Sequence, residues 1–279
     1  MFAIFVAGAI SQYVGAAIGV VLFETTEPAT VAWLRAASAA ALLVAWRRPW
    51  RAGFTRRDVG IAGVFGLVTL GMNVSIYEAF ARIPMGTAVA IEFLGPILVA
   101  ARGLSRRRDL TAVVLAGGGV ALLAGVQPTA SAVGVFFALL AAALWAGYIV
   151  LGKSVADSGR GLDALAVGMA AAAVVSAPFV LIPQAVVNAG TFLDPRTWLF
   201  GLGIGLLSTA IPYALDQVVL ARLGRATFAL LLALLPATAV VVGAVLLAQS
   251  PTAAELGGIA LVMVALALAR PADENARPA

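Results

Sequence analysis

The chain has 279 residues, of which 62% are hydrophobic and only 11% are charged. So apolar a composition favours a lipid bilayer, rather than water, as the solvent of the folded chain. Histidine and cysteine are both absent, which excludes disulfides, thiolate nucleophiles, imidazole bases and metal sites made of these two residues. We therefore expect neither an enzyme nor a bound metal or cofactor.

The apolar residues fall into ten blocks of roughly the length that crosses a bilayer. A helix needs about 20 residues to span the ~30 Å hydrocarbon core, and open strands cannot cross it because their backbone groups would stay unpaired. The first block has neither the basic start nor the cleavage site of a signal peptide, so we interpret it as a span. The polar tail 270–279 is predicted to be disordered. In chain order the blocks are 2–23, 28–46, 59–81, 85–101, 110–126, 132–151, 162–184, 197–218, 226–248 and 252–269.

The positions of lysine and arginine predict how these spans are oriented. With the N-terminus in the cytoplasm, fifteen basic residues fall in cytoplasmic segments and two, Arg82 and Arg196, fall in outer connections. This asymmetry follows the positive-inside rule and predicts that both termini are cytoplasmic. The formal net charge of +5 therefore suits contact with anionic lipid of the inner membrane, and we expect no nucleic-acid partner.

A weak internal repeat divides the chain into two halves. A shift of 140 residues superposes "ARIPMGTAVAIEFLGP" at 81–96 on "ARLGRATFALLLALLP" at 221–236, with five identities in sixteen positions. Each half holds five spans, an odd number, so the second copy enters the membrane from the opposite side. We predict an all-α membrane protein of ten transmembrane helices in two inverted five-helix repeats, 1–129 and 130–269, around a central cavity that holds a substrate.

Glu92 lies in the middle of the apolar run "TAVAIEFLGPILVA". It is about seven residues, or ~10 Å of helix, from the start of its span. A charge at the centre of a membrane helix costs about 2.5–3.5 kcal/mol, so this carboxyl group needs a reason to be there. It either pairs structurally, with Arg35 or another helix, or binds a substrate or a proton in a cavity. We favour the second interpretation, because a carboxyl group can lose its proton when an ammonium group arrives.

Arg35 is the second charged residue within a predicted span, in "TVAWLRAASAA". It either extends toward the membrane surface or faces the cavity as the counter-ion of Glu92 or of a substrate carboxylate. Glu78 and Asp216 lie nearer to helix ends, where we expect interfacial roles, with Arg82 as an i, i+4 partner of Glu78.

Other side chains at membrane depth are candidates to line the cavity, although each also suits helix–helix hydrogen bonding or simple packing. These candidates are Gln12, Asn73, Tyr77, Trp145, Tyr148 and Tyr213. Glycine and proline can let a helix bend, which alternating access requires. The candidate hinges are Gly95, Pro96, Pro212 and Pro236.

Two segments resemble a known family. They are "MNVSIYEAFARIPMGTAVAIEFLGPILVA", which begins at residue 72, and "LSTAIPYALDQVVLARLGRATFALLLALLPA", which begins at residue 207. Both are similar to the bacterial threonine/homoserine exporters within the EamA branch of the drug/metabolite transporter superfamily. The resemblance implies ten helices in two inverted halves in the inner membrane, and efflux of small amino acids driven by protons. The exporter pattern carries glutamate at two positions where this chain has Leu235 and Gln249.

These observations leave several functions open. The first is a secondary transporter that exports small amino acids or related zwitterionic metabolites, with protons, a small-molecule substrate and the lipid bilayer as its partners. The second is efflux of lipophilic cations, drugs or another metabolite, since one fold serves many substrates. The third is a membrane scaffold that transports nothing. An intramembrane hydrolase is disfavoured, because it would need a histidine or lysine base or two facing aspartates.

Overall fold

The structure is a computed structural model that describes residues 2–51, 53–101, 107–126, 131–156, 161–212, 215 and 234–268. Four predictions fall on other residues and stay predictions: the role of Tyr213, the interfacial role of Asp216, most of the repeated copy at 221–236, and the state of the tail 270–279. Every regular element in the described ranges is helical. The chain is therefore all-α there, as predicted.

The helices follow the predicted spans closely. Within the described residues, five of them are long and apolar enough to cross a membrane, and four apolar helices are shorter. The fourth predicted span, 85–101, is divided into α4 and α5, and the ninth is described from residue 234 onward. The elements are α1 (Phe2–Val21), η1 (Leu22–Glu24), α2 (Pro28–Arg47), η2 (Pro49–Arg51), α3 (Arg56–Phe80), α4 (Met85–Glu92), α5 (Leu94–Ala101), α6 (Arg107–Val126), α7 (Ala132–Ala156), α8 (Gly161–Asn188), η3 (Ala189–Phe192), α9 (Pro195–Gly205), η4 (Leu206–Ala210), α12 (Leu234–Leu246) and α13 (Ala253–Leu268).

Local sequence signals explain where several helices begin. Thr55 and Asp58 form a capping box at the start of α3, in which each side chain accepts a hydrogen bond from the other residue's backbone N–H. Asp194 caps α9 by accepting from the N–H of Arg196 at 2.8 Å. Proline occupies the first position of α2, where no intrahelical N–H bond is needed.

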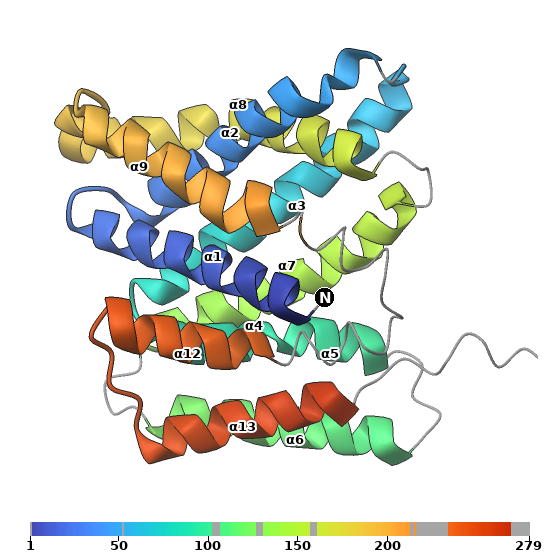
Figure 1. Ribbon diagram of the computed structural model, residues 1–279, viewed down its shortest axis with the longest axis vertical. Coiled ribbons are helices and arrows are strands. Elements are labelled where there is room, and N and C mark those ends of the chain that lie inside the picture. Colours follow the sequence, from blue (N-terminus) through green and yellow to red (C-terminus); the bar gives the residue numbers. More distant parts are fainter. Residues whose placement is uncertain are drawn as a thin grey trace, which may run out of the picture.

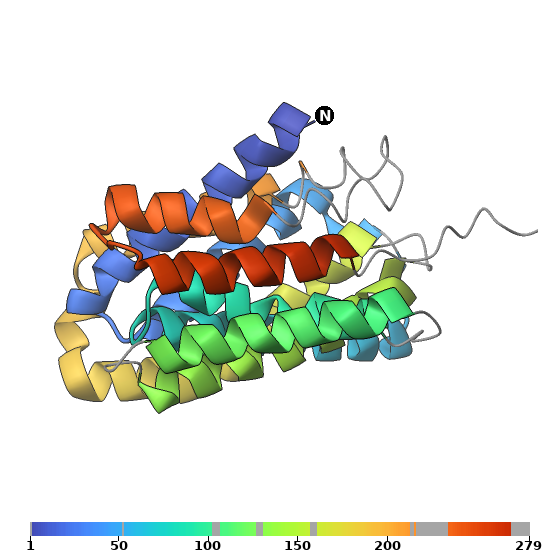
Figure 2. The same ribbon diagram turned by 90° about the horizontal axis from the view of Figure 1, so that it is seen from below.

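The helices run roughly along one direction, as in a bundle that crosses a bilayer (Figure 1). On one side of the bundle α6 packs along α13, and on the opposite side α2 packs on α8 and α9 (Figures 1 and 2). Between them α4 lies against α7 and α12, while α1 contacts α12 and α9. This arrangement places α4, with Glu92 at its end, inside the bundle.

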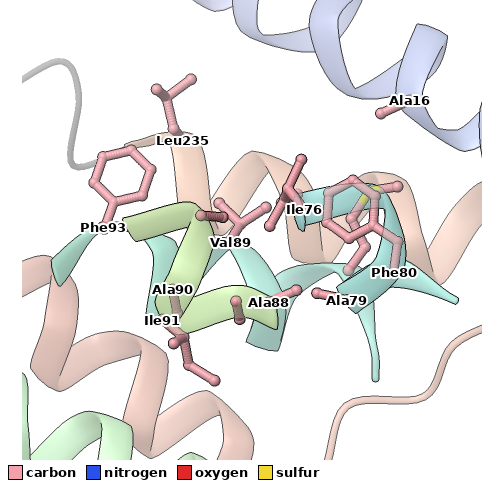
Figure 3. Packing of buried hydrophobic residues seen from close by; sticks show 14 of the residues in the cluster. Ala16, Ile76, Ala79, Phe80, Ala88, Val89, Ala90, Ile91, Phe93 and Leu235 are labelled. Carbon is pink, nitrogen blue, oxygen red and sulfur yellow. The ribbon is translucent and has the colours of Figure 1, made fainter. Parts of the chain in front are cut away.

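The core around α4 is built from small and branched apolar side chains (Figure 3). All eight residues of α4 are buried. Ala88, Val89 and Ile91 are at most 1% exposed, and they belong to the same cluster as Phe80 of α3 and Leu235 of α12. A fully enclosed helix of this kind cannot be a surface segment, so any polar group that it carries is shielded from both lipid and bulk water.

Glycines allow the closest helix contacts. A Cβ atom added at Gly66 of α3 would overlap the backbone carbonyl of Gly168 on α8, and one at Gly95 of α5 would overlap that of Ala142 on α7. Small residues at such crossings let two backbones approach closely, which is how helices in lipid gain most of their packing energy. Gly95, predicted as a hinge, is therefore also a packing residue.

The outward surface of α8 is strongly apolar. Val174, Phe179 and Val186 have 74%, 78% and 81% of their surface exposed. Exposed apolar surface of this extent is unusual for a soluble protein and is expected where a helix faces lipid.

Candidate functional site

The fourth predicted span is interrupted directly after Glu92. Pro96 has no N–H group and so cannot donate to the carbonyl of Glu92, which lies four residues earlier and would accept that bond in an unbroken helix. α4 accordingly ends at Glu92, Phe93 forms a turn, and α5 begins at Leu94 with Pro96 in its first turn. The break therefore falls at Phe93, next to Glu92 and three residues before Pro96, which was predicted as a hinge.

Arg35 points into the bundle and is only 7% exposed. Its Nη2 donates to the backbone carbonyl of Ser208 at 2.9 Å, and its Nε donates to Thr209 Oγ1 at 3.0 Å. The alternative in which Arg35 extends toward the membrane surface is therefore wrong in this conformation, and the alternative in which it faces the interior of the bundle is the one observed. The guanidinium also lies 5.8 Å from the centre of the Tyr77 ring, within the range of a cation–π contact.

The two acceptors of Arg35 lie in an irregular stretch of backbone. Leu206–Ala210 forms a π-helix, closed by the N–H of Ile211 donating to the carbonyl of Leu206. Pro212 cannot supply the donor that an α-helix would give to Ser208, four residues earlier. Arg35 supplies a donor to that carbonyl instead. Single π-helical turns of this kind occur frequently at functional sites.

Helix α1 is hydrogen-bonded to the same π-helical stretch, Leu206–Ala210. The hydroxyl of Ser208 donates to the carbonyl of Gln12 at 2.9 Å, and the hydroxyl of Ser11 donates to the carbonyl of Leu207 at 2.8 Å. Gln12 was predicted as a site residue through its side chain, whereas the bond seen here uses its backbone. The close approach depends on Gly15, because a Cβ at that position would overlap the Ser208 hydroxyl.

Tyr77 completes this group from α3 and is fully buried. Its ring packs on Phe23 and Phe80, with centroid distances of 5.9 Å and 5.7 Å. Its hydroxyl has no hydrogen-bond partner in the described part of the chain, although it lies near Arg35 and Ser208. A buried hydroxyl without a partner is uncommon, which makes Tyr77 a candidate to bind a ligand oxygen.

Glu92 and Arg35 are close enough for their charges to attract each other, and Tyr13 of α1 lies within reach of both. They do not form an ion pair, since no carboxylate oxygen of Glu92 lies within 4.0 Å of an Arg35 nitrogen. Glu92 is 9% exposed. The direct structural pairing considered from the sequence is therefore wrong in this conformation, and a carboxyl group and a guanidinium group stand apart inside the bundle.

Three further predicted residues, Trp145, Asn73 and Tyr148, lie in different surroundings. Trp145 of α7 meets Phe93 edge to face at 4.7 Å, next to Glu92. Asn73 is buried on α3, one turn before Tyr77. Tyr148 instead stacks on Phe65 at 4.9 Å, in a separate cluster formed with α2 and α8.

The predicted interfacial pair is confirmed at the end of α3. Arg82 Nη1 and Glu78 Oε2 form an ion pair at i, i+4 spacing. Among the predicted hinges, Pro212 is buried after the π-helix, and Pro236 is buried in the first turn of α12. Neither position tests whether these residues move.

Sequence reasoning missed three features of the site. Ser208 and Thr209 looked like ordinary small hydroxyl residues, yet they hold Arg35. A signal was present, because Ser208 precedes Pro212 by four residues and so loses a backbone donor. Tyr13 was not among the predicted site residues, although it interacts with both Glu92 and Arg35. Glu255 was not among the predicted site residues either, yet it is 3% exposed and hydrogen-bonded to Thr87 of α4.

Comparison with known proteins identifies the family. The model of the EamA-like transporter family matches residues 132–270. Threonine/homoserine exporter RhtA of Salmonella typhimurium (strain SL1344) is 34% identical over 255 residues, which cover 90% of this chain and 84% of the relative. The chain belongs to the EamA-like transporter family. RhtA of Escherichia coli (strain K12) is 33% identical over the same share of each chain.

Membership of the EamA-like family agrees with the resemblance drawn from the sequence and makes the chain a multi-pass membrane protein. Its relatives are exporters rather than enzymes, which agrees with the expectation of no enzymatic activity. One solved structure, described only as "Crystal structure of protein", has a TM-score of 0.62 and 17% identity, covering 96% of each chain. That likeness concerns the fold alone.

The two departures from the exporter pattern lie in different places. Leu235 is buried in α12, in the cluster that contains Phe93 (Figure 3). The region beside Glu92 therefore carries a leucine where the exporter pattern has a second carboxylate. Gln249 lies after α12, where its Oε1 accepts from the N–H of Met85 at 3.1 Å.

Proposed function

We propose that this EamA-family chain exports small amino acids, threonine and homoserine among them, or related zwitterionic metabolites. The observation that carries the proposal is the burial of Arg35 and Glu92, which form no ion pair with each other. A zwitterion can bridge such a pair, with its carboxylate on Arg35 and its ammonium group on Glu92. Export of threonine and homoserine by the relatives supports this substrate class.

The hydrogen bonds of Arg35 suggest how binding drives a conformational change. A substrate carboxylate on Arg35 competes with Ser208 and Thr209, which hold the guanidinium at 2.9 Å and 3.0 Å. The hydroxyl of Tyr77, which has no partner in the described residues, supplies one further donor to the incoming carboxylate. Release of Ser208 frees the π-helix to change its bonding, with Pro212 beside it as a hinge. Gly95, Pro96 and Pro236 are the corresponding hinges next to Glu92 and in α12.

Glu92 also suits the role of the proton-coupling group. A carboxyl group at membrane depth can be neutral when it carries a proton and charged when it holds an ammonium group, so the two cargoes exclude each other. This exclusion couples export of the substrate to entry of a proton by alternating access. Trp145 and Phe93, in edge-to-face contact beside Glu92, form an apolar wall of the binding region.

We further propose ten spans with both termini in the cytoplasm, arranged as two inverted repeats. If α1, α2, α3, α4 with α5, and α6 correspond to α7, α8, α9, α12 and α13, several contacts between helices occur in matching pairs. The contact of α3 with α7 matches that of α9 with α1, α3 with α8 matches α9 with α2, and α4 with α7 matches α12 with α1. The contacts of α2 with α8, α4 with α12 and α6 with α13 each match themselves. Such a pattern is what a two-fold relation between the halves requires, and it supports a substrate site between them.

Metabolite profiling tests the proposed substrate class. A bacterial strain that overproduces the chain is compared with one that overproduces the Glu92→Gln variant at equal membrane abundance. We expect threonine, homoserine or similar amino acids to accumulate in the medium of the first strain only. Accumulation of lipophilic cations alone would replace the proposal with drug efflux, and identical profiles in the two strains would favour a scaffold.

A further inference from the structure

A second polar region lies at the end of the bundle where α4 and α13 begin. It surrounds a cavity of about 140 Å³ that is lined by Thr87, Val240, Gln249, Ser250, Glu255 and Ile259, among others. Glu255 and Thr87 are each 3% exposed, whereas Ser250 is exposed. The cavity therefore has a buried polar floor and a rim that solutes can reach.

The carboxylate of Glu255 is held in a fixed position. Its Oε2 accepts from the backbone N–H and from the hydroxyl of Thr252, at 2.7 Å and 3.0 Å, and completes a capping box at the start of α13. Its Oε1 accepts from the hydroxyl of Thr87 at 3.1 Å, which ties α13 to α4. A carboxylate positioned by bonds on both oxygens presents its negative charge to the cavity without needing to move.

The chemistry of the lining selects the kind of ligand. A primary ammonium group has three N–H donors, which match the oxygen acceptors of Glu255, Ser250 and Thr87. Val240 and Ile259 form an apolar wall that suits a short aliphatic side chain. A cavity of about 150 Å³ in a protein holds a molecule as large as benzene, so a small amino acid also fits.

The cavity lies toward the opposite end of α4 from Glu92. Thr87, which is bonded to Glu255, and Glu92 are five residues apart on α4, or about 7.5 Å along the helix axis. In the proposed topology the rim residue Ser250 lies on the side of the membrane opposite to both termini. An ammonium group that leaves Glu92 toward that side meets Glu255 next.

We propose that this cavity is an exit subsite, in which Glu255 binds the ammonium group of the exported amino acid before its release. The proposal rests on the exporter function proposed above. It assigns to Glu255 a binding role in addition to its structural role as a helix cap.

The chain offers a direct test because it has no cysteine of its own. The substitution S250C places a single thiol on the rim, and its rate of reaction with a maleimide is measured on the purified full-length chain in a maltoside detergent, which contributes no ammonium headgroup. We expect L-threonine to slow the reaction. N-acetyl-L-threonine, which has the same side chain and carboxylate without the ammonium group, should leave the rate unchanged.

The variant E255Q, made in the S250C background, removes the charge and keeps the shape. The glutamine oxygen can still accept from Thr252, which preserves the helix cap, while the amide NH2 donates to the hydroxyl of Thr87. We expect the concentration of L-threonine that gives half protection to rise about tenfold, the loss that corresponds to one charge-assisted hydrogen bond. The comparison variant, T252A, removes one of the two bonds to Oε2 and retains the charge, so it should raise the half-protecting concentration much less than E255Q does. If E255Q is not monodisperse, Thr87→Val removes the neighbouring hydroxyl and should shift protection in the same direction.

Three results would overturn the proposal: equal protection by the N-acetylated compound, an unchanged half-protecting concentration in E255Q or Thr87→Val, or no protection by L-threonine although the native chain transports it in proteoliposomes. Protection that depends on Glu255 without any transport would instead overturn the exporter function and leave the ammonium site standing. The two failures are thus distinguishable.

Discussion

Replacing Arg35 by methionine separates a binding role from a packing role. Methionine keeps an unbranched stem and removes the guanidinium, which donates to Ser208 and Thr209. A buried carbonyl that loses its donor costs about 1–3 kcal/mol. Removing a charge from membrane depth relieves about 2.5–3.5 kcal/mol. Because these terms nearly cancel, we expect the variant to unfold with a free energy close to that of the native chain.

Transport by the same variant should change strongly and selectively. A hydrogen bond to a charged group contributes about 1.5–3 kcal/mol, which corresponds to a roughly 10- to 100-fold change in affinity. The assay is exchange of labelled L-threonine in proteoliposomes, with unlabelled L-threonine and L-threoninol, which lacks the carboxylate, as competitors. We expect Arg35→Met to weaken L-threonine by that factor and to leave L-threoninol unchanged. Equal weakening of both competitors, together with a large loss of stability, would refute a carboxylate-binding role.

Two other substitutions test the packing and the site. Gly66→Ala should destabilise the chain by about 1–3 kcal/mol because its Cβ would overlap a carbonyl of α8, whereas Gly63→Ala, on the open side of α3, should stabilise it by up to about 1 kcal/mol. Thermal unfolding in detergent measures both, and equal stabilities would contradict the close α3–α8 contact. Tyr77→Phe removes a hydroxyl that has no partner in the described residues, so it should not lower stability, but it should raise the KM for L-threonine in the exchange assay. An unchanged KM would exclude Tyr77 from substrate binding.

The positions of the helices were predictable because each predicted span is a continuous apolar run bounded by charges, prolines or capping residues. Hydropathy and length alone place α2, α7 and α8 within a few residues of their observed bounds. Glu92 and Arg35 stood out for the same reason, since a charge within an apolar run is rare. The depth of a charged residue in the membrane can thus be predicted from its position within an apolar run.

The direction in which a side chain points could not be read in the same way. Trp145 and Tyr148 are three residues apart on α7 and looked equivalent, yet one packs beside Glu92 and the other on Phe65. The turn after Glu92 was displaced from the expected position because proline breaks the bond of the residue four positions earlier. Glu255 was overlooked because its burial depends on α4, which is distant in the sequence.

Proton coupling through Glu92 is the central claim, and transport driven by a pH gradient tests it most directly. The native chain and Glu92→Gln are reconstituted in proteoliposomes that contain a pH-sensitive dye, and uptake of labelled L-threonine is followed with and without an imposed pH gradient. The native chain should accumulate L-threonine against its concentration gradient while protons move the opposite way. Glu92→Gln should insert normally and show neither movement. Accumulation driven by the pH gradient in the glutamine variant would contradict the assignment of the coupling proton to Glu92.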